Sequence, residues 1–419
     1  MHARKSDRRL PRTVLLLGWV SFFADVSSEM IYPLIPLFVV GVLGASATTL
    51  GGIEGGAAFL VAIVTAWAGW RSDRHRRRVP YVRVGYGLPV LGKSLIALAT
   101  AWPMVLAGRL TDRLGKGLRG SPRDALMVDA TSQDMRGRAF GFHRAMDTGG
   151  ALVGVLASAA LLWWLTGSPQ TATDNAPAHA ESAGTYRLIF AIAAALGLIS
   201  LAIAFLVRDT HPKAQPDTLP DAPTTQQSAD HSRFPASYWR TVALLLVFSL
   251  ANSSDAFILL RARDTGLTAW AVVLAYAAYN AIYALVSYPA GVISDRINRW
   301  HVVTLGWAVY AITYAGFALT GATAVWPLLT LYGVYMALTD GVGKALVADH
   351  APQGRRGTAL GLFSMANGLT MLLASILGGL LWDHAGPKAT FGAGAAIATL
   401  AVILVLILRP RPANATDPS

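Results

Sequence analysis

Carboxylates lie inside long apolar stretches of this 419-residue sequence, where a charge is expensive. Asp25 and Glu29 are four residues apart in one such stretch, and Asp255 lies in another. A charge at the bilayer centre costs about 2.5–3.5 kcal/mol on insertion scales, so it normally faces a cavity, a partner or a pathway. Two acids one helical turn apart also repel each other when both are ionised. The pattern predicts carboxylates that take up and release protons at a central site.

Basic side chains accompany acids in two other stretches, at a spacing that favours helical ion pairs. Asp112 precedes Lys116 by four residues, and Asp340 precedes Lys344 by four. Two interpretations are open. The pairs neutralise each other so that the helix can insert, or the lysines hold an anionic group of a substrate.

Arginines supply possible partners for the acids that have no base in their own stretch. Arg109 or Arg113 could bridge to such an acid from another helix, either as a fixed structural link or as a link that exchanges during a functional cycle. The candidate substrate- and proton-binding residues are Asp25, Glu29, Arg109, Asp112, Arg113, Lys116, Asp255, Asp340 and Lys344.

The elements that carry these residues are predicted to span a membrane. The chain is 54% hydrophobic and 14% charged, whereas soluble domains have about 45–50% apolar and about 25% charged residues. A spanning helix needs about 20 mostly apolar residues. Twelve stretches meet this requirement: 13–41, 49–70, 80–99, 103–127, 138–166, 186–207, 239–262, 268–292, 301–321, 325–349, 358–382 and 388–408.

The second half of the sequence repeats the first. The letters ADVSSE at 24–29 resemble ANSSD at 251–255, and TDRLGK at 111–116 resembles TDGVGK at 339–344. Parallel repeats of this kind place a site between two halves. We therefore expect an all-α integral membrane protein with an N-terminal six-helix bundle at 1–207, a polar linker at 208–238 and a C-terminal six-helix bundle at 239–419.

Lysine and arginine placement predicts the orientation. If both termini are cytoplasmic, cytoplasmic segments hold 25 of the 35 basic residues and periplasmic segments hold four. The sequence therefore predicts a multi-pass protein of the inner membrane with both termini in the cytoplasm.

Several other classes of protein are disfavoured. The net charge of +12 comes from short clusters between apolar runs, which argues against nucleic acid as a partner. Without cysteine the chain has no disulfide or thiolate chemistry, and no HExxH or GxSxG motif is present. The letters at 87–94 fit a nucleotide-binding loop but lie inside a predicted spanning helix, whose amides are already bonded. We expect no enzyme activity, no metal and no cofactor.

The loops after the second and eighth predicted spans carry two copies of a short sequence motif. GWRSDRHRRR at 69–78 resembles the G-x-L-x-D-R-x-G-R-K/R signature of the major facilitator superfamily, with Arg71 in place of the leucine and Arg76 in place of the second glycine. A second copy begins at Gly291, and Arg109 with the glycines that follow it resembles the family's arginine-centred signature. By this resemblance the gating residues are Gly69, Asp73, Arg74, Gly291, Asp295 and Arg296.

The resemblance implies a secondary transporter that works by alternating access. We expect a monomer in the lipid bilayer that moves a small polar, charged or amphiphilic solute, with protons as the coupling ion. Drug/proton antiporters of the family usually carry a proline shortly before a glycine pair in the fifth span. This sequence has the pair, Gly149 and Gly150, without the proline. The direction of transport therefore stays open, and export is preferred. Alternatives are an uptake permease for an organic anion or metal chelate, a membrane-embedded enzyme, and a channel or lipid scramblase.

For the other polar residues in the apolar stretches we expect minor or alternative roles. Sodium coupling is an alternative to protons, with Ser27, Ser28, Ser253 and Ser254 as oxygen ligands. Lys93 is expected to have a carboxylate partner, and Glu54 is a minor candidate for the site. Arg144 and Asp147 are expected to pair with each other. The tyrosines of one stretch are interpreted as packing or interfacial residues: Tyr276, Tyr279, Tyr283 and Tyr288.

Overall fold

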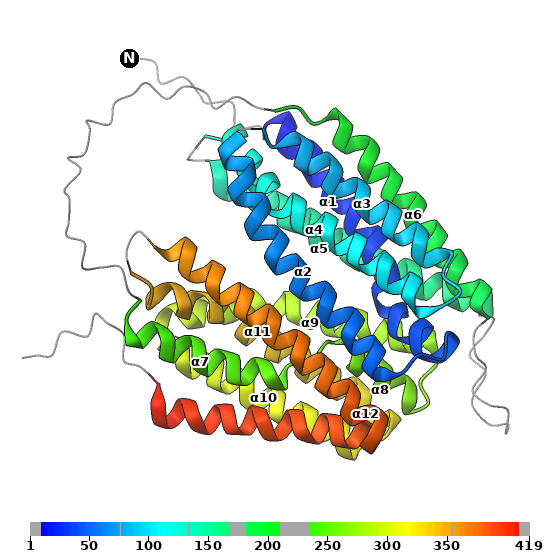
Figure 1. Ribbon diagram of the computed structural model, residues 1–419, viewed down its shortest axis with the longest axis vertical. Coiled ribbons are helices and arrows are strands. Elements are labelled where there is room, and N and C mark those ends of the chain that lie inside the picture. Colours follow the sequence, from blue (N-terminus) through cyan, green and yellow to red (C-terminus); the bar gives the residue numbers. More distant parts are fainter. Residues whose placement is uncertain are drawn as a thin grey trace, which may run out of the picture.

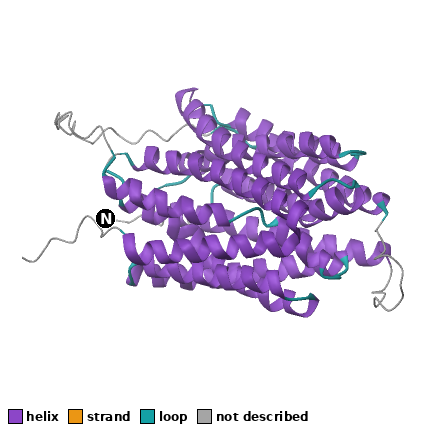
Figure 2. Ribbon diagram, turned by 60° about the horizontal axis from the view of Figure 1, so that its bottom comes forward, coloured by secondary structure: helices purple, strands orange, loops and turns teal. Residues whose placement is uncertain are grey.

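The computed structural model describes residues 10–75, 77–132, 135–166, 182–209, 234–352 and 355–409. Helices and loops account for all of this described part, which contains no strand (Figure 2). The elements in chain order are α1 Arg12–Ile31, η1 Tyr32–Leu34, η2 Leu37–Val42, α2 Ala47–His75, α3 Val79–Ala97, α4 Trp102–Ala130, α5 Arg136–Thr166, α6 Ala183–Leu206, α7 Ala236–Ala251, α8 Ala256–Asp264, α9 Ala269–Arg296, α10 Arg299–Leu319, η4 Ala322–Ala324, α11 Val325–Asp349 and α12 Arg356–Leu408.

The helices form two groups that follow the chain. Helices α1 to α6 lie together in the upper part of Figure 1, and α7 to α12 lie together in the lower part. Nine helical segments of the described residues are long and apolar enough to cross a membrane. Helices α3 and α4 are long but more polar, and α12 counts once although Gly386 divides it into two legs. The twelve crossings predicted from the sequence fit this arrangement, and the all-α membrane fold is confirmed.

Two predicted spans are not continuous helices. The span that begins with α1 continues through short 3-10 and π segments after Pro33 and Pro36. The span at 239–262 is broken between α7 and α8, where Asn252 leaves the helical conformation (φ −87°, ψ 73°). Asp255 immediately precedes α8, so the break places a half-buried carboxylate within the predicted span. Such irregular backbone is tolerated where protein or a cavity surrounds it.

The helix ends define two faces of the molecule. At one of them, which we call the linker face, α1 begins, α6 ends, α7 begins and α12 ends (Figure 1). The predicted linker 208–238 starts there, and its residues 210–233 lie outside the described part. At the opposite face the chain turns at Gly44, Gly266 and Gly386, whose φ angles of +66°, +100° and +81° favour glycine.

Glycines bring helices of the first group close to one another. An added Cβ at Gly150 or Gly154 of α5 would collide with the carbonyl oxygens of Phe22 and Val26 on α1. In the same way Gly92 of α3 and Gly108 of α4 face each other's backbone. Small residues allow such close packing of helices in lipid. They fix the position of α1, which carries two of the predicted site acids.

The two groups meet mainly through α2 with α12 and α5 with α9. At the opposite face Asp383 of α12 caps the first turn of α2. It accepts hydrogen bonds from the backbone N–H groups of Ala47 (2.9 Å) and Thr48 (2.8 Å) and from the Thr48 hydroxyl (2.6 Å). A carboxylate at a helix N-terminus is favoured by the exposed amides and the helix dipole. This cap joins the two groups at one face only.

Candidate functional site

A buried ion pair anchors the first group of helices. The Arg109 guanidinium donates two hydrogen bonds to the Glu54 carboxylate, at 2.8 and 2.5 Å. The two residues are 4% and 6% exposed, so water screens the pair little. Arg109 was one of two possible partners for Asp25, Glu29 and Asp255. It instead binds Glu54, which was only a minor candidate for the site.

Asp112 lies next to this pair and not next to the lysine predicted for it. Its carboxylate is 3.9 Å from Nη1 of Arg109 and 3.8 Å from Nε of Arg113. Lys116 is exposed, and no carboxylate of the described residues lies within 4.0 Å of its amine. The predicted Asp112/Lys116 pair is therefore not formed, because Arg109 and Arg113 are the basic residues that lie beside the carboxylate.

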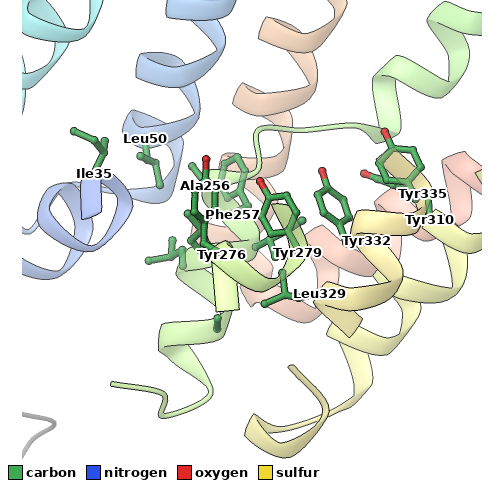
Figure 3. Packing of buried hydrophobic residues seen from close by; sticks show 14 of the residues in the cluster. Ile35, Leu50, Ala256, Phe257, Tyr276, Tyr279, Tyr310, Leu329, Tyr332 and Tyr335 are labelled. Atoms are coloured by element: carbon green, nitrogen blue, oxygen red, sulfur yellow. The ribbon is translucent and has the colours of Figure 1, made fainter. Parts of the chain in front are cut away.

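The acids of α1 and α8 are held by tyrosines of the second group. The Tyr276 hydroxyl donates to Oε2 of Glu29 at 2.6 Å, which joins α9 to α1. Asp255 accepts from Tyr332 at 2.6 Å and from Tyr279 at 3.2 Å. Tyr276 and Tyr279 are buried and packed against each other, as interpreted from the sequence, and their hydroxyls in addition bind the site carboxylates. Figure 3 shows Tyr276, Tyr279 and Tyr332 side by side, continuing to Tyr310 and Tyr335.

The repeat-related acid of α11 has a different environment. Asp340 is 3.8 Å from Lys344 and accepts a hydrogen bond from Tyr283 at 2.9 Å. The side chains of Asp340 and Lys344 are 52% and 65% exposed. The predicted pair is thus formed here, at the side of a pocket of about 370 Å³. Its lining residues are Arg144, Tyr283, Ser287, Gly291, Ser294, Arg299, Ala337, Asp340, Gly341, Val342 and Ala345.

Arg144 is the residue of the first group that reaches this pocket. It does not pair with Asp147 as expected, since Asp147 lies 3.5 Å from His143. Tyr288 is 80% exposed, as an interfacial side chain would be.

Asp25 and Lys93 lie within the first group, and neither makes an ion pair with another described residue. Asp25 is half-buried, and its strongest electrostatic neighbours are Asp147, Lys116 and Arg119. Lys93 is buried and donates to the hydroxyls of Ser27 (2.7 Å) and Ser28 (3.0 Å), so its partners are hydroxyls and not the expected carboxylate. The ammonium group thus uses oxygens that were candidate sodium ligands.

The predicted gating residues lie at the linker face. Gly69 packs closely on Ser121 of α4, and Arg74 is exposed, with its guanidinium 5.7 Å from the Trp70 ring. Gly291 lines the pocket, and Arg296 ends α9 in an exposed position. The side chains of Asp73 and Asp295 lie outside the described part, so their gating role stays a prediction.

Tyr332 and Asp383 join parts of the molecule, and both were missed in the sequence analysis. Tyr332 makes the shorter hydrogen bond to Asp255, and Asp383 caps α2. A tyrosine in an apolar stretch is ordinary, and only the fold reveals its partner. Asp383 had a usable signal, because it is an acid near the end of an apolar stretch and close to Gly386-Pro387.

The comparison with known proteins identifies the family. The Major Facilitator Superfamily profile matches residues 17–339 and again residues 241–419. An uncharacterized MFS-type transporter of Methanocaldococcus jannaschii is 32% identical over 411 residues, covering 96% of each sequence. The chain belongs to the major facilitator superfamily.

Other similarities agree with this membership. The multidrug resistance protein MdtH of Photorhabdus laumondii subsp. laumondii is 34% identical over 134 residues, which cover 32% of this chain and 33% of that protein. The crystal structure of a POT family transporter in complex with 5-aminolevulinic acid has a TM-score of 0.74 at 12% identity and covers 96% of each chain. That likeness supports the fold of this major facilitator protein, and the family relationship makes it a multi-pass membrane transporter.

Proposed function

We propose that this protein is a proton-coupled secondary transporter that exports a small charged or amphiphilic solute across the inner membrane. The halves are residues 1–207 and 239–419, joined by a cytoplasmic linker, and they rock about a central site. The linker face is the cytoplasmic face, because it carries most of the basic residues. The protein acts as a monomer.

The hydrogen bond between Tyr276 and Glu29 carries this proposal. It joins the two halves at 2.6 Å, and its acceptor is a group that can be protonated. When Glu29 takes up a proton it ceases to be an anionic acceptor, and this charge-assisted bond weakens. Protonation at one atom is thereby linked to the contact between the halves, which is what coupling between a proton and alternating access requires.

Asp255 and Asp25 extend this proton site. Asp255 is held by Tyr332 and Tyr279 without a base within 4.0 Å in the described part, and Glu29 is among its electrostatic neighbours. Asp25 feels Glu29 from the same helix. A proton can therefore be shared among three acids without separating an ion pair.

Two observations support the choice of protons over sodium and of export over uptake. The use of Ser27 and Ser28 by the Lys93 ammonium disfavours a sodium ion at those hydroxyls, since a second cation would be repelled. Export is favoured by the partial similarity to proteins named for resistance and export, including the tetracenomycin C resistance and export protein of Streptomyces glaucescens.

Proton coupling is tested in inverted membrane vesicles that contain the protein and are acidified by respiration. A pH-sensitive dye reports the gradient while cationic, anionic and neutral solutes are added in turn. We expect a transported solute to release protons in the wild type, and Glu29→Gln and Asp255→Asn to abolish that release while the proteins remain folded. Asp264→Asn is the matched control, because it neutralises an exposed carboxylate of α8 outside the site. Solute transport at a rate that does not depend on the pH gradient would refute proton coupling.

A further inference from the structure

The carboxylates between the two halves are surrounded by aromatic rings. Glu29 and Asp255 bind the hydroxyls of Tyr276, Tyr279 and Tyr332. The Tyr32 ring completes the group, with its centroid 5.6 Å from that of Tyr276. We refer to these six residues, Glu29, Tyr32, Asp255, Tyr276, Tyr279 and Tyr332, as the acidic tyrosine cluster.

The two carboxylates of the cluster have no ion-pair partner in the described part of the chain. Within the described part, no lysine, arginine or histidine nitrogen lies within 4.0 Å of Glu29 or Asp255. The nearby Glu54 is neutralised by Arg109. Buried charges are normally paired, so two carboxylates with only hydroxyl partners leave room for a positive charge supplied from outside the protein.

The rings add a second attraction for a cation. The faces of tyrosine rings attract positive charge within about 6 Å of the ring centroid. The cluster itself provides an example, because the Arg109 guanidinium lies 5.6 Å from the centroid of the Tyr32 ring. Tyr276 and Tyr279 meet edge to face at 5.1 Å, and Tyr279 meets Tyr332 at 5.5 Å. Figure 3 shows these three rings as a row, which we call the aromatic wall. Their hydroxyls bind the two carboxylates.

The cluster is accessible although it lies between the halves. Glu29, Tyr32 and Asp255 are half-buried, while Tyr276 and Tyr332 are 5% and 1% exposed. The site is therefore partly accessible at Glu29, Tyr32 and Asp255, and the buried tyrosines form its closed side. A ligand would approach the acids and lean against the aromatic wall.

We propose that the acidic tyrosine cluster binds an organic cation, with its positive centre at Glu29 and Asp255 and its apolar groups against the tyrosine rings. This inference rests on the proposed function and names the substrate class of its central site. A cation and a proton would compete for the same two carboxylates. That competition would make the exchange obligatory, with one ligand leaving as the other binds.

Tetraphenylphosphonium tests the proposal, and tetraphenylborate is a control of nearly the same size and shape with the opposite charge. Equilibrium dialysis with purified protein should show saturable binding of the cation and none of the anion. Glu29→Gln and Asp255→Asn should each weaken cation binding at least tenfold, whereas Asp264→Asn, at an exposed carboxylate of α8 that pairs with Arg261, should leave it unchanged. Saturable binding of the anion, or cation binding that both site variants retain, would overturn the proposal.

Two substitutions at one position separate the ring from the hydroxyl. Tyr276→Phe keeps the aromatic face and should retain binding within about threefold, while Tyr276→Leu should weaken it by about fivefold or more, as expected for a lost cation–π contact. Equal effects of both variants would contradict a role for the ring. The folded state of each variant is checked by its melting temperature, so a loss of binding is not mistaken for unfolding.

Protons should compete with the cation. Binding should weaken as the pH falls, because protonated carboxylates no longer attract the cation, and it should lose this dependence in the double variant of Glu29 and Asp255. The other charged groups that act on the cluster are Asp25, Glu54, Arg109, Arg113 and Lys116. Proton-coupled movement of an anionic or neutral solute, without phosphonium binding, would refute the organic cation and leave the proposed transporter function intact.

Discussion

The two halves of the protein stabilise charge in different ways. In the first half a guanidinium holds Glu54, and two arginines flank Asp112. In the second half tyrosine hydroxyls hold Asp255, and Asp340 is bound by Tyr283 near an exposed lysine. Glu54 and Asp112 are thus neutralised by fixed opposite charges, whereas Asp255 is held by neutral donors. Glu29 shares the second arrangement although it lies in the first half, because the Tyr276 hydroxyl binds it.

The comparison also shows what a sequence repeat preserves. The letters TDRLGK and TDGVGK place Asp112 and Asp340 at equivalent positions. Asp112 is nevertheless buried between arginines, whereas Asp340 is exposed. Arg113, which corresponds to Gly341, is one cause of the difference. Equivalent residues therefore should not be assigned equivalent roles.

The largest effect is expected at the buried ion pair of the first half. Arg109→Gln or Glu54→Gln alone should destabilise the protein by about 3–5 kcal/mol, because the remaining charge is left buried without a partner. The double variant with leucine at both positions should recover much of this loss. Melting temperature and monodisperse yield in detergent measure the effect. A single variant as stable as the wild type would show that the pair is dispensable.

A smaller effect should distinguish the two repeat-related aspartates. Asp112→Asn leaves two guanidiniums with a weaker acceptor and should destabilise by about 1–3 kcal/mol. Asp340→Asn disturbs an exposed pair and should change stability by about 0.5 kcal/mol or less. The two variants are compared by thermal unfolding in the same detergent. Equal losses would mean that the two halves stabilise these aspartates alike.

The tyrosines of the second half should differ from each other by their hydrogen bonds. Tyr332 donates to Asp255 at 2.6 Å and Tyr279 at 3.2 Å. Tyr332→Phe should destabilise by about 1–2 kcal/mol, since a buried charge-assisted bond is lost, and Tyr279→Phe by less. A double-mutant cycle with Asp255→Asn measures each coupling energy. The reverse order would contradict the geometry of the site.

The smallest effect is expected at Lys116. Its amine has no carboxylate within 4.0 Å in the described part and is exposed. Lys116→Gln should therefore change tetraphenylphosphonium binding by less than about threefold, a difference of about 0.7 kcal/mol or less. A loss of tenfold or more would revive the idea that this lysine contributes directly to the binding site.

Composition and periodicity were sufficient to predict the helical membrane fold, because a bilayer requires long apolar helices. They also located most of the acids that the fold brings together, since charge inside an apolar stretch is conspicuous. Partners could not be predicted. Whether Arg109 reaches Glu54 or Glu29 depends on the rotation of α2 and α4, and one residue of rotation redirects a side chain by about 100°. Tyr276 looked like a packing residue until its hydroxyl could be placed.

The cap that Asp383 forms on α2 bears on how often the opposite face of the protein is closed or open. In the proposed alternating-access cycle, its three hydrogen bonds would break together when the opposite face opens, since all of them cross between the halves. At about 1 kcal/mol each, they would favour the closed face by roughly a hundredfold in population. The waiting time before this face opens would then depend on a carboxylate in the second half and a helix end in the first. Evolution could retune that interval at Asp383 or Thr48 without altering any residue that binds the solute.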